Sequence, residues 1–201
     1  MIQKQQILRL GLATIVAMPF VAIIIDRFSD TVDLSVSLIG YKPWWLQITV
    51  GVISGLIIAV LAQKLISSPI LSKVNVQYAR MLGNFRLSWS EILFISMCAG
   101  VGEELLFRGA IQPLLGVVLT SMIFVAIHGY INPYNWRLSV YGLYMTLAII
   151  GLGIINDYFG LIAPIIAHTI IDVYLLHHMQ KTAEADTMDD MNTESEDVTI
   201  D

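Results

Sequence analysis

Long apolar runs recur along the chain and constrain its fold more than any other feature. Six of them approach the length of a membrane-crossing helix, which needs about 20 residues at about 1.5 Å of rise each. They cover residues 7–25, 46–62, 91–102, 110–127, 138–155 and 159–176. None alternates polar and apolar residues as a membrane β-strand does. The runs therefore predict an all-α, polytopic transmembrane helical bundle with about six spans.

Composition and charge are typical of a membrane protein and distinguish an acidic tail at its C-terminal end. Hydrophobic residues make up 56% of the chain and charged residues only 13%, which excludes an ordinary water-soluble domain. The 201 residues carry 11 bases and 16 acids, and eight of the acids but no base lie within residues 182–201. We therefore expect a membrane domain over residues 1–178 and a disordered acidic tail over 179–201. The net negative charge predicts no nucleic-acid partner.

The distribution of Lys and Arg predicts the orientation in the cell membrane. With the N-terminus inside and six spans, two bases, Arg27 and Lys42, face outward. Eight face inward: Lys4, Arg9, Lys64, Lys73, Arg80, Arg86, Arg137 and Lys181. Because positive charge in loops favours the inner side, both termini are expected in the cytoplasm.

Three ionisable residues follow the third run, where a bilayer does not tolerate them unpaired. Glu103, Glu104 and Arg108 would each cost about 2.5–3.5 kcal/mol near mid-membrane. Glu104 and Arg108 are four residues apart in the acid-first order, which favours an ion pair along one helix face. Glu103 lies about 100° around the helix from Glu104 and stays free of that pair. We interpret Glu103 as the available carboxylate and a candidate general base.

Two histidines interrupt later apolar runs, each with a neighbour one helical turn away. Phe124 precedes His128, and Asp172 follows His168. A His–Asp pair at this spacing can supply a metal ligand with its orienting carboxylate, or two ligands from one face. Glu103, His128 and His168 together match the His₂Glu set of many catalytic zinc sites. The sequence therefore predicts a divalent-metal site, with Zn²⁺ as the favoured ion.

Each of these motifs also has a purely structural interpretation. A single membrane histidine such as His128 or His168 often makes only an interhelical hydrogen bond. The pair Glu104–Arg108 by itself is equally compatible with a structural ion pair. Phe124 is better explained as a packing residue than as a catalytic one. The combination of all three motifs in apolar segments is what favours a functional site.

The three motifs in order resemble the CPBP family of intramembrane proteases. That family includes the type II CAAX prenyl endopeptidases and bacteriocin-processing or self-immunity proteins, and the resemblance covers residues 91–176. It implies hydrolysis of a peptide bond in a membrane-associated peptide or protein. Glu103 and His128 would activate a water, while His168 and Asp172 would stabilise the oxyanion or complete a metal site. The implied catalytic set is Glu103, Glu104, His128, His168 and Asp172, supported by Arg108 and Phe124, with Glu103, His128 and His168 as metal ligands.

One position departs from the family pattern, because prenyl-processing members usually have asparagine where this chain has Asp172. An ionised aspartate cannot donate a hydrogen bond, which favours metal ligation or orientation of His168 over oxyanion binding. The resemblance leaves open a metal-independent glutamate mechanism. The complete ligand set favours the metal-dependent one.

Two other classes of protein remain compatible with the motifs. A non-enzymatic membrane immunity or scaffold protein would retain the same residues structurally. A small transporter would use them as a proton relay, although the sequence has no evident internal repeat or paired broken helices. For a protease, Glu103, His128 and His168 must lie at similar depth. We therefore expect the fourth helix to continue past His128 and to end at Asn132 and Pro133.

Overall fold

The structure, a computed structural model, describes residues 2–72, 75–76, 85–131 and 134–197, and every regular element in these ranges is a helix. The elements are α1 (Ile2–Phe28), α2 (Leu34–Ile39), α3 (Trp44–Ile66), α5 (Trp89–Glu104), the π-helix η1 (Leu105–Ile111), α6 (Gln112–Ile127), α7 (Trp136–Phe159) and α8 (Ile162–Asp197). Five stretches of the described residues are long and apolar enough to cross a membrane. The predicted all-helical, multi-pass architecture is thus confirmed.

The third and fourth apolar runs belong to one continuous stretch, which explains five candidate spans where about six were expected. This stretch, Trp89–Ile127, is 39 residues long. Gly116 breaks it, with φ 76° and ψ 165°, a conformation open to glycine at little steric cost. Beyond Gly116 the chain folds back, so that the ring of Phe124 lies 5.0 Å from that of Phe107. The stretch is a helical hairpin with one long and one short arm.

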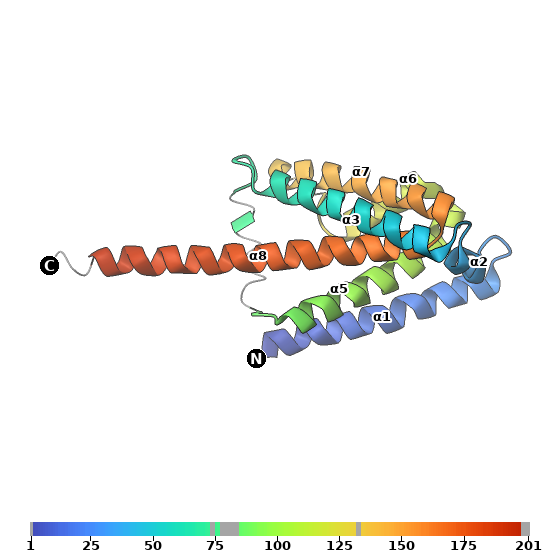
Figure 1. The fold of residues 1–201 in the computed structure, drawn as a ribbon, viewed down its shortest axis with the longest axis horizontal. Coiled ribbons are helices and arrows are strands. Elements are labelled where there is room, and N and C mark those ends of the chain that lie inside the picture. Colours follow the sequence, from blue (N-terminus) through green and yellow to red (C-terminus); the bar gives the residue numbers. More distant parts are fainter. Residues whose placement is uncertain (1, 73–74, 77–84, 132–133, 198–201) are drawn as a thin grey trace.

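Helix α8 runs through the middle of the bundle. In Figure 1, α3 and α7 lie on one side of it and α1 and α5 on the other, and both termini lie toward the same end. Two glycines bring α3 against α8: a Cβ added to Gly51 would lie 2.6 Å from the carbonyl oxygen of Ala163, and one added to Gly55 2.8 Å from that of Ala167. Such small-residue faces let membrane helices approach closely.

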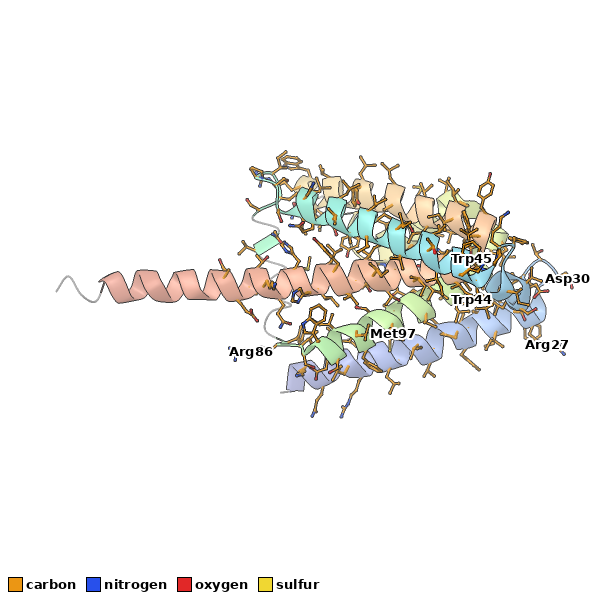
Figure 2. The ribbon with its side chains drawn as sticks, viewed as in Figure 1. Arg27, Asp30, Trp44, Trp45, Arg86 and Met97 are labelled. Carbon is orange, nitrogen blue, oxygen red and sulfur yellow. The ribbon has the colours of Figure 1, made fainter. Side chains whose placement is uncertain are left out.

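The outer faces of the bundle carry many exposed apolar side chains, as Figure 2 shows. Trp44 and Trp45, 67% and 57% exposed, stand at the start of α3. Tryptophan is enriched at the boundary between the bilayer and water. The outer surface of the bundle is therefore suited to lipid contact. The two tryptophans place one boundary between bilayer and water at the end of the bundle opposite the termini.

Local signals set the ends of the hairpin. Ser88 and Glu91 form a capping box that begins α5, and Lys4 of α1 contacts the Glu91 carboxylate at 2.7 Å. At the other end, α6 stops at Ile127 because Gly129 adopts a φ of +74° directly after His128. The expectation that this helix continues through residue 131 is therefore wrong. Its predicted end at residues 132–133 lies outside the described residues.

Helix α8 continues through Asp197, whereas the composition predicts disorder from residue 179. Ten of the 19 residues from 179 to 197 are Ala, Glu, Met, Gln or Lys, which all favour helix in the absence of tertiary packing. Near the start of this extension, the Gln180 side chain pairs with both the N–H and the carbonyl oxygen of Leu87, each at 3.1 Å. This contact ties the emerging helix to the segment before α5. Residues 198–201 lie outside the described part.

Candidate active site

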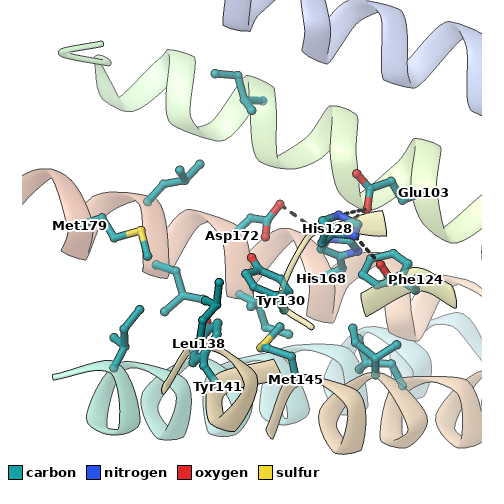
Figure 3. Close-up of a pocket in the computed structure, with 17 residues that line it drawn as sticks. Glu103, Phe124, His128, Tyr130, Leu138, Tyr141, Met145, His168, Asp172 and Met179 are labelled. Atoms are coloured by element: carbon teal, nitrogen blue, oxygen red, sulfur yellow. Dashed lines mark hydrogen bonds and ion pairs between the residues drawn. The ribbon is translucent and has the colours of Figure 1, made fainter. Parts of the chain in front are cut away.

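Four of the predicted site residues meet inside the bundle. Glu103 lies in the last turn of α5, His128 directly follows α6, and His168 and Asp172 lie one turn apart on α8. The Oε2 atom of Glu103 lies 3.4 Å from His128 Nε2 and 4.0 Å from His168 Nε2. Asp172 Oδ2 lies 3.6 Å from His168 Nε2. Figure 3 shows these side chains pointing toward one another at one end of a cavity.

Glu104 makes the ion pair predicted from its spacing and a second contact that the spacing does not indicate. Its carboxylate is fully buried, and Oε1 lies 3.0 Å from the NH1 atom of Arg108. The same oxygen accepts a hydrogen bond from His168 Nδ1 at 2.7 Å. The carboxylate that orients His168 is therefore Glu104, where the sequence suggested Asp172. Asp172 instead faces the opposite ring nitrogen, on the cavity side.

Both histidines are held through Nδ1 and present Nε2 to Glu103. His128 Nδ1 donates to the carbonyl oxygen of Phe124 at 2.7 Å, four residues earlier in the last turn of α6. His168 Nδ1 is held by Glu104, as described above. A hydrogen bond at one ring nitrogen fixes the tautomer and the ring orientation. The cluster therefore has two fixed imidazoles whose Nε2 atoms both face the Glu103 carboxylate.

Phe124 is the packing centre of the site, in agreement with its structural interpretation. Its ring stacks on His128 at 4.4 Å and meets the edge of His168 at 5.8 Å. The guanidinium carbon of Arg108 lies 4.8 Å from the ring centre. Phe124 itself is only 3% exposed. This one ring thus fixes the relative positions of both histidines and the buried arginine.

The segment that follows the two glutamates is a π-helix, η1, a feature that the sequence does not reveal. It covers seven residues, Leu105–Ile111, and includes Arg108. Short π-helical segments are rare and occur frequently at functional sites. Here η1 begins immediately after Glu104. The wider helical turn therefore follows directly after two adjacent carboxylates with different partners. Glu103 faces the histidines, and Glu104 pairs with Arg108.

A cavity of about 280 Å³ opens from the cluster. It follows α8 from His168 to Met179, a distance of about 16 Å at the rise of an α-helix. Its walls are mostly apolar and include Tyr141 and Met145 of α7 (Figure 3). Sequence reasoning did not find these lining residues, because tyrosine and methionine are ordinary interior residues of helices and carry no motif.

The donor atoms at the cluster fit a divalent metal ion in kind. A Zn²⁺ ion binds N and O donors at about 2.0–2.2 Å, so tetrahedral ligand atoms are about 3.3 Å apart. The Glu103 oxygen lies 3.4 and 4.0 Å from the two Nε2 atoms, is buried, and has no hydrogen-bond partner among the described residues. In that part of the chain, no three His, Cys, Asp or Glu side chains form an assembled metal cluster. The three side chains are thus of the types that bind Zn²⁺, and their ligand atoms lie farther apart than in an assembled tetrahedral site.

These features define a polytopic membrane protein with a buried Glu–His cluster on three converging helices. Comparison with known proteins gives the family of one part of the chain. Residues 85–174, somewhat less than half of the chain, match the family described as type II CAAX prenyl endopeptidase Rce1-like. The chain therefore carries an Rce1-like domain of the CPBP family, as the motifs predicted, and all four clustered residues lie within it.

Among the curated proteins, the chain is similar to the uncharacterized protein YpbD of Bacillus subtilis (strain 168). The two are 35% identical over 83 residues, which is 40% of this chain and 41% of YpbD. The chain thus spans less than half the length of this relative. No solved structure matches the chain.

Proposed function

We propose that this protein is an intramembrane endopeptidase that hydrolyses a peptide bond of a membrane-associated peptide or protein. Family membership of residues 85–174 suggests a peptidase. The observation that carries the proposal is the meeting of Glu103, His128, His168 and Asp172 at the end of an apolar cavity. A carboxylate and two oriented imidazoles around one small space are the groups that peptide hydrolysis needs.

Glu103 is the proposed general base. A water that contacts Glu103 and His128 from the cavity side would lose a proton to the Glu103 carboxylate while its oxygen bonds to the carbonyl carbon of the substrate. When the carbon–nitrogen bond breaks, the same proton passes to the departing amine. His168, ordered by its 2.7 Å hydrogen bond to Glu104, presents Nε2 to the reacting group. Proton transfer by a positioned side chain contributes about 10²–10⁴-fold to such a reaction.

The metal ligands in this proposal are Glu103, His128 and His168. A bound divalent ion, Zn²⁺ by ligand type, would supply Lewis-acid polarisation of the scissile carbonyl. Metal analysis of the purified protein tests this point. We expect about one ion per chain in the wild type, and loss of that ion in His128→Ala. The control is His178→Ala, which removes a histidine of α8 that does not line the cavity and should keep the ion.

The proposed orientation has both termini in the cytoplasm. Helices α1, α5 and α7 begin on the side of the termini, and α3 ends there (Figure 1). The basic residues at or near these helix ends and connections are Lys4, Arg9, Lys64, Arg86 and Arg137. Lys181 lies on the C-terminal half of α8, which extends toward the same side. The cavity extends from His168 toward Met179, which is the same direction. Substrate would therefore enter from the cytoplasmic half of the membrane.

The proposed activity is tested by comparing new peptide termini in membranes from cells that produce the wild type or a variant. We expect a set of cleavage products that disappears in Glu103→Gln and His128→Ala. Glu184→Gln, the same substitution on the exposed surface of α8, is the matched control and should retain all products. Unchanged products in Glu103→Gln protein would instead support a non-enzymatic scaffold.

A further inference from the structure

Tyr141 lies in the wall of the cavity that opens from the Glu–His cluster and takes no part in the chemistry described above. It belongs to the first half of α7, and only 3% of its surface is exposed. Its hydroxyl has no hydrogen-bond partner among the described residues. Because a buried tyrosine hydroxyl usually has a partner, this O–H group favours a ligand in the cavity that accepts a hydrogen bond.

Neighbouring rings connect Tyr141 to the cluster. The ring of His128 stacks on that of Tyr130, with centres 6.0 Å apart, and Tyr130 meets the edge of Tyr141 at 5.4 Å. The Asp172 carboxylate lies near enough to interact with Tyr141 electrostatically. Figure 3 shows these side chains around the same cavity. Tyr141 is thus one ring removed from a histidine of the proposed site.

Tyr144, three residues later on α7, is a tyrosine whose hydroxyl has a structural role. This hydroxyl donates to the carbonyl oxygen of Ile58 on α3 at 2.7 Å, and Tyr144 does not line the cavity. Its ring lies 6.4 Å from that of Tyr141. The two neighbours therefore differ in one respect that can be tested. The Tyr144 hydroxyl joins two helices, whereas the Tyr141 hydroxyl is available to a ligand.

A peptide substrate brings backbone carbonyl oxygens into this cavity, and these need donors. A carbonyl group moved from water into an apolar site without a hydrogen bond weakens binding. Glu103 and Asp172 only accept hydrogen bonds when they are ionised. The Nε2 atoms of both histidines face Glu103. Tyr141 can therefore supply a donor that the reacting groups do not.

We propose that the Tyr141 hydroxyl donates a hydrogen bond to a backbone carbonyl oxygen of the substrate, in a residue that flanks the scissile bond. This inference rests on the proposed peptidase function. Inside a helix, a carbonyl already accepts a hydrogen bond from the N–H four residues later. Tyr141 therefore binds a substrate segment that is extended beside the scissile bond. Proton transfer remains the role of Glu103.

Steady-state cleavage by the full-length protein in lipid vesicles tests the proposal. The substrate is a peptide that spans one of the cleavage sites found by the comparison of membranes. Tyr141→Phe removes the hydroxyl and keeps the ring. We expect its KM to rise about tenfold, as for a buried carbonyl left without a partner, and its kcat to change by less than about threefold.

Modified substrates locate the carbonyl that accepts this hydrogen bond. Replacing one backbone carbonyl oxygen at a time by sulfur gives thioamide peptides, in which that acceptor is weaker. One thioamide beside the scissile bond should raise the KM of the wild type. It should leave the KM of Tyr141→Phe unchanged, because both changes remove the same interaction.

Two tyrosines of the same helix provide the controls. Tyr158→Phe, at a position 68% exposed, should behave like the wild type. Tyr144→Phe should lower the temperature of unfolding and change KM by less than about twofold, because its hydroxyl bonds within the protein.

The results that overturn this inference differ from those that overturn the peptidase function. Cleavage by Tyr141→Phe with the KM of the wild type would overturn the inference and leave the peptidase function standing. A fall in kcat at unchanged KM would also overturn it, because the hydroxyl would then act only in the transition state. Absence of any cleavage product in wild-type membranes would overturn the peptidase function itself, and the inference with it.

Discussion

Replacing Glu104 by glutamine is expected to destabilise the protein strongly, although the two side chains have nearly the same shape. Glu104 is fully buried, and its Oε1 atom contacts both Arg108 at 3.0 Å and His168 at 2.7 Å. Glutamine would leave the Arg108 guanidinium, 1% exposed, with no opposite charge in contact. Coulomb's law at 3.0 Å with an effective dielectric constant of about 20 gives about 5.5 kcal/mol for the lost attraction.

Measured losses of one partner from a buried ion pair are about 3–5 kcal/mol, so we expect a destabilisation of that size. The free energy of unfolding in mixed detergent micelles is the appropriate assay. Glu184→Gln, on the exposed face of α8, is the control and should change this free energy by less than about 0.5 kcal/mol. A loss below about 1 kcal/mol for Glu104→Gln would refute the assignment of a buried ion pair.

A double variant separates stability from activity. Replacing both Glu104 and Arg108 by leucine removes the two buried charges together, and such replacements are often neutral or stabilising. We expect the double variant to regain half or more of the stability lost in Glu104→Gln. It should lack peptidase activity, because His168 would no longer be oriented through Nδ1. Recovery of activity together with stability would show that the His168 contact is unimportant.

Three further substitutions test the site from other directions. Phe124→Ala should lower the free energy of unfolding by about 3–5 kcal/mol in the same micelle assay, since this ring packs against both histidines. Asp172→Asn should retain at least about a tenth of the cleavage rate, because asparagine keeps the shape beside His168. A cleavage rate as low as that of Glu103→Gln would indicate that the negative charge of Asp172 is required, as it is for a metal ligand. Gly142→Ala should slow cleavage about tenfold or more, because its new Cβ would overlap the carbonyl oxygen of Tyr130, two residues after His128. The control for that change is Gly151→Ala in the same helix, where a Cβ meets nothing within 4 Å.

Much of the site is predictable because membrane helices make buried polar residues conspicuous. The four-residue spacing predicted the Glu104–Arg108 pair, and the cost of charge in lipid predicted that Glu103 would meet polar partners. The motifs also predicted that both histidines belong to one cluster. These inferences depend on helical periodicity and on burial energy, which act locally and are visible in the sequence.

The spacing of residues along the sequence could not predict contacts between distant segments. The hydrogen bond between Glu104 and His168 joins residues 64 positions apart, and depends on how α5 packs against α8. The reversal at Gly116 depends on one positive φ angle, which glycine permits but does not require. The end of α6 at Ile127, directly before His128, follows from the same freedom at Gly129.

Cleavage by purified protein in lipid vesicles tests the central claim most directly. The substrate is a peptide that spans one of the cleavage sites found by the comparison of membranes, and the reaction is run in water enriched in heavy oxygen. Our account expects one heavy oxygen atom in the new carboxyl terminus with the wild type and no product with Glu103→Gln protein of equal folded yield. Cleavage by the Glu103→Gln protein at the wild-type rate would contradict it.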